Sequence, residues 1–255
     1  IGTALLAFVV TGFLLLAGGF DPLEAYGLIL QGSVGGVREG GETLVRTTSL
    51  LLTGLAVGFA FRCKVWNIGA EGQLYFGAIG AVVIALTVAG QIPVFGVIIA
   101  IIFAMIFGAG WAAIAGVLKS RLGVNEIIVT VMLNFIAILF VDFLVHGALK
   151  APGFEPQTAL IPLTSQLPIL IEGTRFHAGF LVAIAAAVLI YLILFKTKTG
   201  FSLRATGVNP KASGYAGINV KRSILLTLLI SGAVAGIAGA CLVQGVNDRL
   251  LVGIS

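Results

Sequence analysis

Charged residues are scarce in this sequence: only 10% of its 255 residues are Asp, Glu, Lys or Arg, against about 25% in ordinary soluble domains. Hydrophobic residues make up 59% of the chain, and the mean hydropathy is +1.14. This composition excludes a water-soluble globular protein. Seven membrane spans of about 20 residues would use about 140 residues, which leaves room for loops but not for a large aqueous domain.

Cysteine is nearly absent, and the motifs of common catalytic sites are missing. Cys63 and Cys241 lie far apart without the spacing of a metal site or a disulfide framework, so we expect two buried thiols. The phosphate-binding pattern GxxxxGK(S/T) does not occur, and neither do HExxH or GxSxG. We therefore expect no enzyme, no ATP bound by the chain itself, and no metal or cofactor.

Apolar runs free of Lys and Arg predict an all-α fold, a polytopic transmembrane helix bundle of about seven spans. Gly232 and Gly236, and likewise Gly54 and Gly58, are predicted to form small-residue faces that pack against neighbouring helices. The second run is short for a span unless its helix begins near Leu44. The runs are Ile1 to Ala17, Leu50 to Phe61, Ile68 to Ile92, Pro93 to Leu118, Ile127 to Val145, Phe176 to Phe195 and Ile224 to Val243.

The positions of Lys and Arg predict the orientation of the bundle. Loop 196–222 carries six basic residues and no acid, which makes it cytoplasmic. Alternation from this loop places ten Lys and Arg inside and five outside, so topology and anionic inner-leaflet lipid explain the net charge of +5. No nucleic-acid partner is needed. The outer basic residues are Arg38, Arg46, Lys150, Arg175 and Arg249.

The chain is expected to form a single transmembrane domain over residues 1–255, with an outer loop at 146–175 and the cytoplasmic loop at 196–222. It starts at Ile1 instead of Met and stops soon after the last run, so we expect a piece of a longer protein. The outer loop holds four of the seven prolines. It is either an interfacial lid or docking surface, or an extended connector that its prolines keep from forming helix.

A first polar cluster, Asn67-Ile68-Gly69-Ala70-Glu71-Gly72-Gln73, opens the third apolar run. A carboxylate within the membrane is costly and is by default a candidate functional residue. The glycines would let a ligand or a neighbouring helix approach the backbone. The alternative is an ordinary helix start, with Asn67 as its cap and Glu71 near the positive helix end.

A second polar cluster follows Asn125 in the fifth run. At 100° per residue, Glu126, Thr130 and Asn134 fall on one face of an otherwise apolar helix. This face is predicted to look into the bundle. Lining of a transport path and hydrogen bonding between helices both remain open for it.

The cytoplasmic loop contains the signals of one short helix. Asn209 is a typical N-cap residue, Pro210 suits the first helical position, and Gly217 suits the position after the end. A helix of about seven residues is marginal alone in water. It is therefore expected to pack on something, either on a cytoplasmic partner or simply within a solvated basic loop.

Taken together, these blocks resemble the permease subunits of bacterial ABC importers, in the nucleoside and simple-sugar branch that is related to ribose and branched-chain amino acid permeases. The resemblance covers most of the chain from Phe59 onward. It rests on the residues from Phe61 to Leu74, Val124 to Asn134, Leu203 to Ile218 and Ser231 to Gly236.

The resemblance implies a multi-pass subunit of the bacterial plasma (inner) membrane that forms the translocation pathway for nucleosides or related sugars. It also implies a cytoplasmic ATP-binding subunit, a second permease subunit and an extracytoplasmic substrate-binding protein as partners. A secondary transporter that uses Glu71 or Glu126 as a proton relay is the alternative. The implied pathway residues are Asn67, Glu71, Gln73, Asn125, Glu126, Thr130 and Asn134, and the implied ATPase-coupling residues are Arg204, Gly207, Asn209, Pro210, Ala212, Tyr215 and Gly217.

Overall fold

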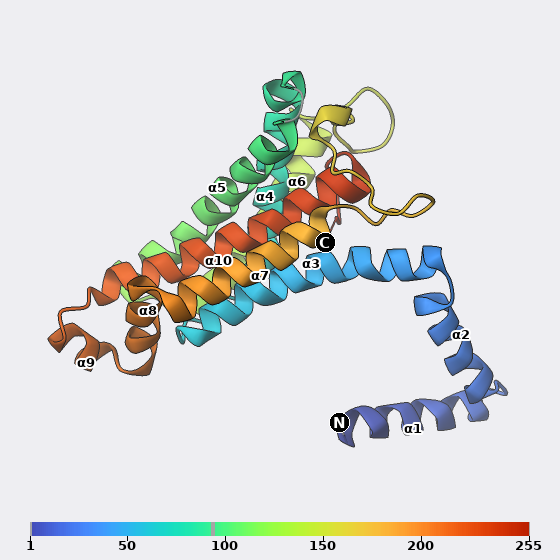
Figure 1. The fold of residues 1–255 in the computed structure, drawn as a ribbon, viewed down its shortest axis with the longest axis horizontal. Helices are drawn as coiled ribbons and strands as arrows, with labels where there is room; N and C mark the ends of the chain where they lie inside the picture. Colours follow the sequence, from blue (N-terminus) through green and yellow to red (C-terminus); the bar gives the residue numbers. More distant parts are fainter. Residues whose placement is uncertain (1, 93–94, 255) are drawn as a thin grey trace.

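The computed structural model describes residues 2–92 and 95–254, so Ile1 and Pro93, the first residues of two predicted spans, lie outside the described residues. Within these ranges, six helices are long and apolar enough to cross a membrane (Figure 1). Each of them overlaps one predicted run, which confirms the all-α polytopic bundle. They are α3 (Val37–Arg62), α4 (Ala70–Thr87), α5 (Gly96–Val117), α6 (Glu126–His146), α7 (Gly179–Lys196) and α10 (Val220–Leu242).

The remaining predicted run forms α1 (Gly2–Ala17), an apolar helix of 16 residues. At 1.5 Å per residue it rises about 24 Å, less than the roughly 30 Å of a hydrocarbon core. α2 (Pro22–Val34), which was not predicted, begins with a proline, and its cap Asp21 accepts a hydrogen bond from the amide of Leu23 at 2.8 Å. Figure 1 shows α1 apart from the bundle, joined to α3 through α2.

α3 is longer than its apolar run, as a span at this run requires, and it begins seven residues before Leu44. It starts at Val37 and includes Arg38, Glu39, Glu42 and Arg46 in its first turns. These charges do not end the helix, because each is at least partly exposed there. The apolar run marks only the inner part of the helix.

The loop predicted to be cytoplasmic folds into α8 (Lys198–Val208) and α9 (Pro210–Tyr215). α9 confirms the predicted short helix: Asn209 Oδ1 accepts a hydrogen bond from the amide of Ala212 at 3.0 Å, and Gly217 follows with a φ of +81°. α8 was missed at the sequence level. It starts at Thr197, whose hydroxyl accepts a hydrogen bond from the amide of Gly200 at 3.0 Å.

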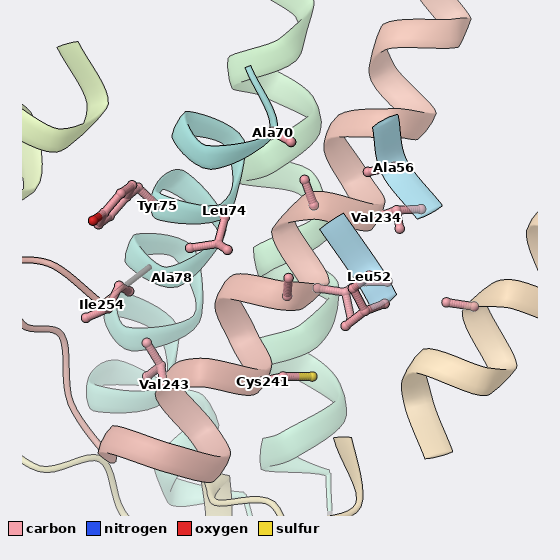
Figure 2. Packing of buried hydrophobic residues seen from close by; sticks show 14 of the residues in the cluster. Leu52, Ala56, Ala70, Leu74, Tyr75, Ala78, Val234, Cys241, Val243 and Ile254 are labelled. Carbon is pink, nitrogen blue, oxygen red and sulfur yellow. The ribbon is translucent and has the colours of Figure 1, made fainter. Parts of the chain in front are cut away.

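The core lies where α3, α4, α5 and α10 meet, and Figure 2 shows Leu52, Leu74 and Val234 from three of these helices among its buried side chains. Glycine makes this close packing possible. A Cβ atom on Gly236 would overlap the carbonyl oxygen of Ala104, and one on Gly232 would overlap Ala112, which confirms the predicted packing face on α10.

The same prediction for Gly54 and Gly58 was wrong. Both glycines are exposed, and a Cβ atom on either would meet nothing within 4 Å. Their spacing resembles that of the α10 glycines, but they lie on the face of α3 that points away from the bundle. The pattern alone does not say which helix face has a neighbour.

The residues predicted as cytoplasmic and as outer gather at opposite ends of the bundle (Figure 1). At one end, α8 and α9 pack beneath the turn after α3, where Gly207 lies against the backbone of Cys63. At the other end, the segment before α7 meets the last residues of the described chain, and the amide of Ile161 donates to the carbonyl oxygen of Asp248 at 2.8 Å.

The predicted outer loop is mostly extended, with one short 3₁₀ turn at Leu163–Ser165. It does not hang free, since Ile161 and Leu167 are buried. The hydroxyl of Thr164 donates to the carbonyl oxygen of Gly90 at 2.9 Å, and the amide of Leu167 donates to that of Gln244 at 2.7 Å. The loop therefore covers the outer ends of α4 and α10.

Candidate functional site

The chain enters α4 through a non-helical segment, residues 63–69, in which Cys63, Val65, Asn67 and Gly69 are buried and Lys64, Trp66 and Ile68 are exposed. Asn67 in this segment is fully buried, and its Nδ2 donates to the hydroxyl of Ser231 at 2.7 Å. Ser231 in turn donates to the carbonyl oxygen of Ala56 at 2.7 Å. Ser231 and Ala56 both lie within the length of their helices, so α4 begins inside the bundle and not at its surface.

Irregular backbone is tolerated at membrane depth only where protein or a water-filled cavity satisfies its polar groups. Here Asn67 and Gln73 bond mainly to each other, and Asn67 also satisfies one backbone group. Each amide nitrogen donates to the other residue's amide oxygen at 2.9 Å, and Asn67 Oδ1 also accepts from the backbone amide of Gly69 at 3.1 Å. The first predicted polar cluster is therefore largely self-bonded.

The polar stripe of α6 was predicted to look into the bundle, and in the structure it faces this same segment. Thr130 is fully buried, and Gly69 packs against it. Asn134 Oδ1 accepts a hydrogen bond from the amide of Gly72 at 2.9 Å, while its Nδ2 donates to the carbonyl oxygen of Ile68 at 2.9 Å. The contacts of Asn134 are therefore hydrogen bonds to the α4 entry.

Glu126 begins the stripe at the start of α6, and Asn125 precedes it. Glu126 is buried and forms an ion pair with Lys119, with Nζ and Oε2 2.5 Å apart. Its other oxygen accepts from the backbone amide of Trp66 at 3.5 Å. Asn125 is exposed and caps α6 by accepting a hydrogen bond from the amide of Ile127 at 2.9 Å.

Glu71 has a different position from the rest of its cluster. It is exposed in the first turn of α4 and lines a cavity of about 720 Å³. Among the described residues, it is the one member of the seven predicted pathway residues that lines this cavity. The cavity lies between α3, the start of α4 and the outer end of α10, and its other polar lining residues are Glu42, Arg46, Ser49, Thr53, Arg175 and Asn247.

An ion pair on the outer part of the cavity wall was not found from the sequence. Arg175 donates from Nε and Nη2 to the two carboxylate oxygens of Glu42, at 2.7 and 2.6 Å. The hydrogen bond to Glu42 raises the pKa of Arg175. The pair joins α3 to the segment before α7, and its partners stand too far apart in the chain for any local pattern to link them.

The seven predicted coupling residues divide into two groups at the cytoplasmic end. Arg204 lies over the ring of Phe195, 5.0 Å from its centre, and Gly207 packs on the backbone of Cys63, so both hold α8 against the bundle. The other five are exposed on or beside α9, and Tyr215 is 94% exposed. These five are Asn209, Pro210, Ala212, Tyr215 and Gly217.

Comparison with known proteins identifies similar chains. This chain is 37% identical over 241 residues to a guanosine ABC transporter permease protein of Bacillus subtilis, covering 92% of this chain and 68% of that protein. It is 33% identical to a nucleoside ABC transporter permease protein of Lactococcus lactis (91% and 66% covered). It is also 33% identical to a glucose ABC transporter permease protein of Haloferax volcanii (97% and 68% covered).

The chain thus spans about two thirds of the length of these relatives. No solved structure matches it. Residues 41–253 match the family model described as "branched-chain amino acid transport system / permease component". With its membrane-spanning helices, the chain therefore belongs to this family of ABC transporter permeases, multi-pass transport components of the plasma membrane.

Proposed function

We propose that this chain is the transmembrane subunit of an ATP-driven importer that carries nucleosides or related sugars into the cell. The observation that carries the proposal is the start of α4 inside the bundle, which places Glu71 at a cavity of about 720 Å³. Ligand pockets are typically about 300–1,000 Å³. The substrate class is supported by the names of the relatives, which include guanosine, nucleoside and glucose permeases.

Within the pathway, Glu71 faces the transported molecule. The other six predicted pathway residues have a positioning role, which their hydrogen bonds support. Asn67, Glu126 and Asn134 accept hydrogen bonds from the irregular backbone before α4 or from its first turn. Gln73 holds the side chain of Asn67, Thr130 packs against Gly69, and Asn125 caps α6.

ATP is hydrolysed on a separate cytoplasmic subunit that docks on the exposed surface of α9. The proposal is supported by the contact between Gly207 and the backbone of Cys63. Cys63 begins the non-helical segment that leads to Glu71, so a displacement of α8 by the partner reaches the cavity through seven residues, 63–69. The chain itself supplies transport and not hydrolysis.

Two further partners complete the importer. A second permease subunit covers the open side of the cavity, where Leu50 is 71% exposed and Gly54 offers a small, exposed contact point on α3. An extracytoplasmic binding protein delivers the substrate to the outer end, where the segment before α7 covers α4 and α10. Anionic lipid surrounds the basic cytoplasmic end.

The test is uptake into proteoliposomes that contain the full-length importer complex. ATP supplied on the cytoplasmic side of the ATP-binding subunit is expected to drive uptake of labelled nucleoside, while a pH gradient without ATP drives none. Uptake driven by the pH gradient alone would contradict the proposal and support the proton-coupled alternative. The ion pair of the buried Glu126 with the half-buried Lys119 is unsuited to that alternative, because a relay carboxylate must give up its partner to take a proton.

A further inference from the structure

The turn after α3 ends the helix with an unusual residue. The amide of Val65 donates to the carbonyl oxygen of Ala60 at 3.1 Å, and the amide of Lys64 donates to that of Phe61 at 3.0 Å. This pair of hydrogen bonds forms the Schellman motif, in which glycine usually takes the left-handed position after the helix end. Here Lys64 holds that position, with a φ of +52°. The backbone alone would favour glycine, so the lysine side chain has another role.

The helix dipole does not explain this lysine. A cation near a helix C-terminus is favourable, but Arg62 already lies in the last turn of α3. Lys64 is exposed, and within the described part of the chain it has no ion-pair partner. Its ammonium group is therefore available to a group from outside the chain.

Lys64 lines a small cavity together with Phe61, Val65 and Trp66. The volume of this cavity is about 220 Å³, below the roughly 300–1,000 Å³ of pockets that hold a whole small molecule. The rings of Phe61 and Trp66 pack against each other with their centres 4.8 Å apart, and the two residues are 43% and 52% exposed. The cavity thus combines a cation with two exposed aromatic rings and has room for only part of a molecule.

The charge of Lys64 is not offset by Glu126, whose carboxylate is bonded to this segment. Glu126 accepts from the amide of Trp66 at 3.5 Å, but it is 6% exposed and already paired with Lys119. Among the described residues that line the cavity, Lys64 is the one that carries a charge. A ligand in the cavity therefore meets a positive charge, and the complementary ligand is an anion.

The position of the cavity along α3 indicates which anion. The apolar run ends at Phe61 and is followed by Arg62 and Lys64, a change in polarity expected at the membrane surface. Trp side chains are enriched at this level of a bilayer. The end of α3 also lies on the side predicted to be cytoplasmic, where the leaflet is anionic and basic pockets between helices bind lipid head groups.

We infer that the cavity at Lys64 binds the phosphate of an anionic phospholipid from the inner leaflet. The ammonium group pairs with the phosphate, while the rings of Phe61 and Trp66 lie against the glycerol part of the same lipid. A zwitterionic lipid binds less well, because its own cation already compensates its phosphate. The inference goes beyond transport, since it assigns a lipid site to a surface that the proposed pathway does not use.

The test uses the purified full-length importer in nanodiscs with equal amounts of phosphatidylglycerol and phosphatidylcholine. A trace of one lipid or the other carries a photoactivatable group next to its phosphate. Illumination and peptide mass spectrometry then measure how strongly each lipid labels residues 61–66. In the wild type we expect phosphatidylglycerol to label this segment about fivefold more than phosphatidylcholine, the factor that one lysine contributes near an anionic surface.

Lys64→Gly is the most informative variant, because glycine adopts a positive φ without strain and leaves the helix end intact. It should remove the preference for phosphatidylglycerol, whereas Lys64→Arg keeps the charge and should keep most of the preference. Lys64→Gln should act like the glycine variant and carries the test if that variant does not assemble. Lys221→Gln is the matched control and should leave the preference unchanged, because Lys221 is exposed in the first turn of α10 and lies outside the cavity lining.

Three results would overturn the inference. Equal labelling by the two lipids, or a preference that survives both neutral variants, would leave the two rings as an ordinary aromatic membrane anchor. Labelling by neither lipid would mean that another subunit covers the cavity. A fall in labelling when glycerol 3-phosphate is added in excess would assign the cavity to a soluble anion, whereas labelling that resists this competitor supports the lipid site.

Discussion

Asn134 on α6 holds the first turn of α4 through both atoms of its side-chain amide. Its oxygen accepts from the amide of Gly72, and its nitrogen donates to the carbonyl oxygen of Ile68, each at 2.9 Å. A helix that begins inside a membrane protein needs such partners for its first backbone groups. The position of Glu71, one residue before Gly72, therefore depends on a side chain from another helix.

Replacing Asn134 should consequently impair transport without a change in the cavity lining itself. Asn134→Leu removes both hydrogen bonds, each of which contributes about 0.5–1.5 kcal/mol net. We expect uptake to be largely lost and the melting temperature of the purified protein to fall. Asn134→Asp retains the acceptor for the amide of Gly72. Its uptake and melting temperature should therefore lie between those of the wild type and those of Asn134→Leu. Full uptake by Asn134→Leu would show that the bonds do not position α4.

The close contact of α10 with α5 should make Gly236 intolerant of any side chain. A Cβ atom there overlaps the carbonyl oxygen of Ala104, so Gly236→Ala is expected to destabilise the bundle by about 1–3 kcal/mol. Gly54→Ala is the matched control, because a Cβ atom on Gly54 meets nothing within 4 Å. Thermal melting in detergent measures the stability of both variants. Equal melting temperatures for the two variants would refute the packing account.

The link between α8 and the turn after α3 should be needed for coupling but not for assembly. Gly207→Ala pushes α8 away from the backbone of Cys63. We expect the complex with the ATP-binding subunit to purify normally, while ATP hydrolysis continues with reduced uptake. Ala212→Glu changes the exposed surface of α9 instead and should weaken binding of the ATP-binding subunit. If Gly207→Ala leaves the ratio of uptake to hydrolysis unchanged, the Cys63 contact does not transmit the motion.

His177 should make the stability of the protein depend on pH. It is 1% exposed, and this burial lowers its pKa below the ordinary value of 6.5. Above pH 6.5 the imidazole is neutral in both the folded and unfolded states. Below pH 6.5 the imidazole binds a proton in the unfolded state but stays neutral in the folded state. The free energy of unfolding therefore falls by at most about 1.4 kcal/mol per pH unit.

The measurement compares melting at pH 7.5 and pH 5.5 for the wild type, His177→Gln and His146→Gln. The loss of stability at the lower pH should be smaller in His177→Gln than in the wild type. His146 is exposed and lies 3.2 Å from Asp142, so its replacement should leave most of the pH dependence in place. If His146→Gln reduces the loss of stability at pH 5.5 and His177→Gln does not, His177 is excluded as the cause of the pH dependence.

The sequence predicted the elements that are determined by interactions between residues close together in the chain. Asn209, Pro210 and Gly217 predicted α9 nearly to the residue, because a cap, a first-turn proline and a glycine with positive φ act within one short segment. The apolar runs located the spans for the same reason. The apolar run of α3 is shorter than the helix, because the charged residues in its first turns do not interrupt it.

Long-range relationships escaped prediction. Gly54 and Gly236 each belong to a pair with the same spacing, yet only Gly236 has a neighbouring helix among the described residues. The polar clusters around Asn67 and Asn134 were recognised as candidates, but their mutual contact depends on the packing of α6 against α4. The pairing of Glu42 with Arg175 joins α3 to the segment before α7, so no local sequence pattern indicates it.

The central claim is that this permease moves nucleosides at the expense of ATP hydrolysed on its partner. The most direct measurement is uptake of labelled guanosine, with ribose as the comparison, into cells that express the complete importer with an intact or a disabled ATP-binding subunit. The account predicts guanosine uptake that disappears with the disabled subunit. Ribose uptake without guanosine uptake would contradict the nucleoside assignment, and guanosine uptake that survives loss of ATP hydrolysis would contradict the mechanism.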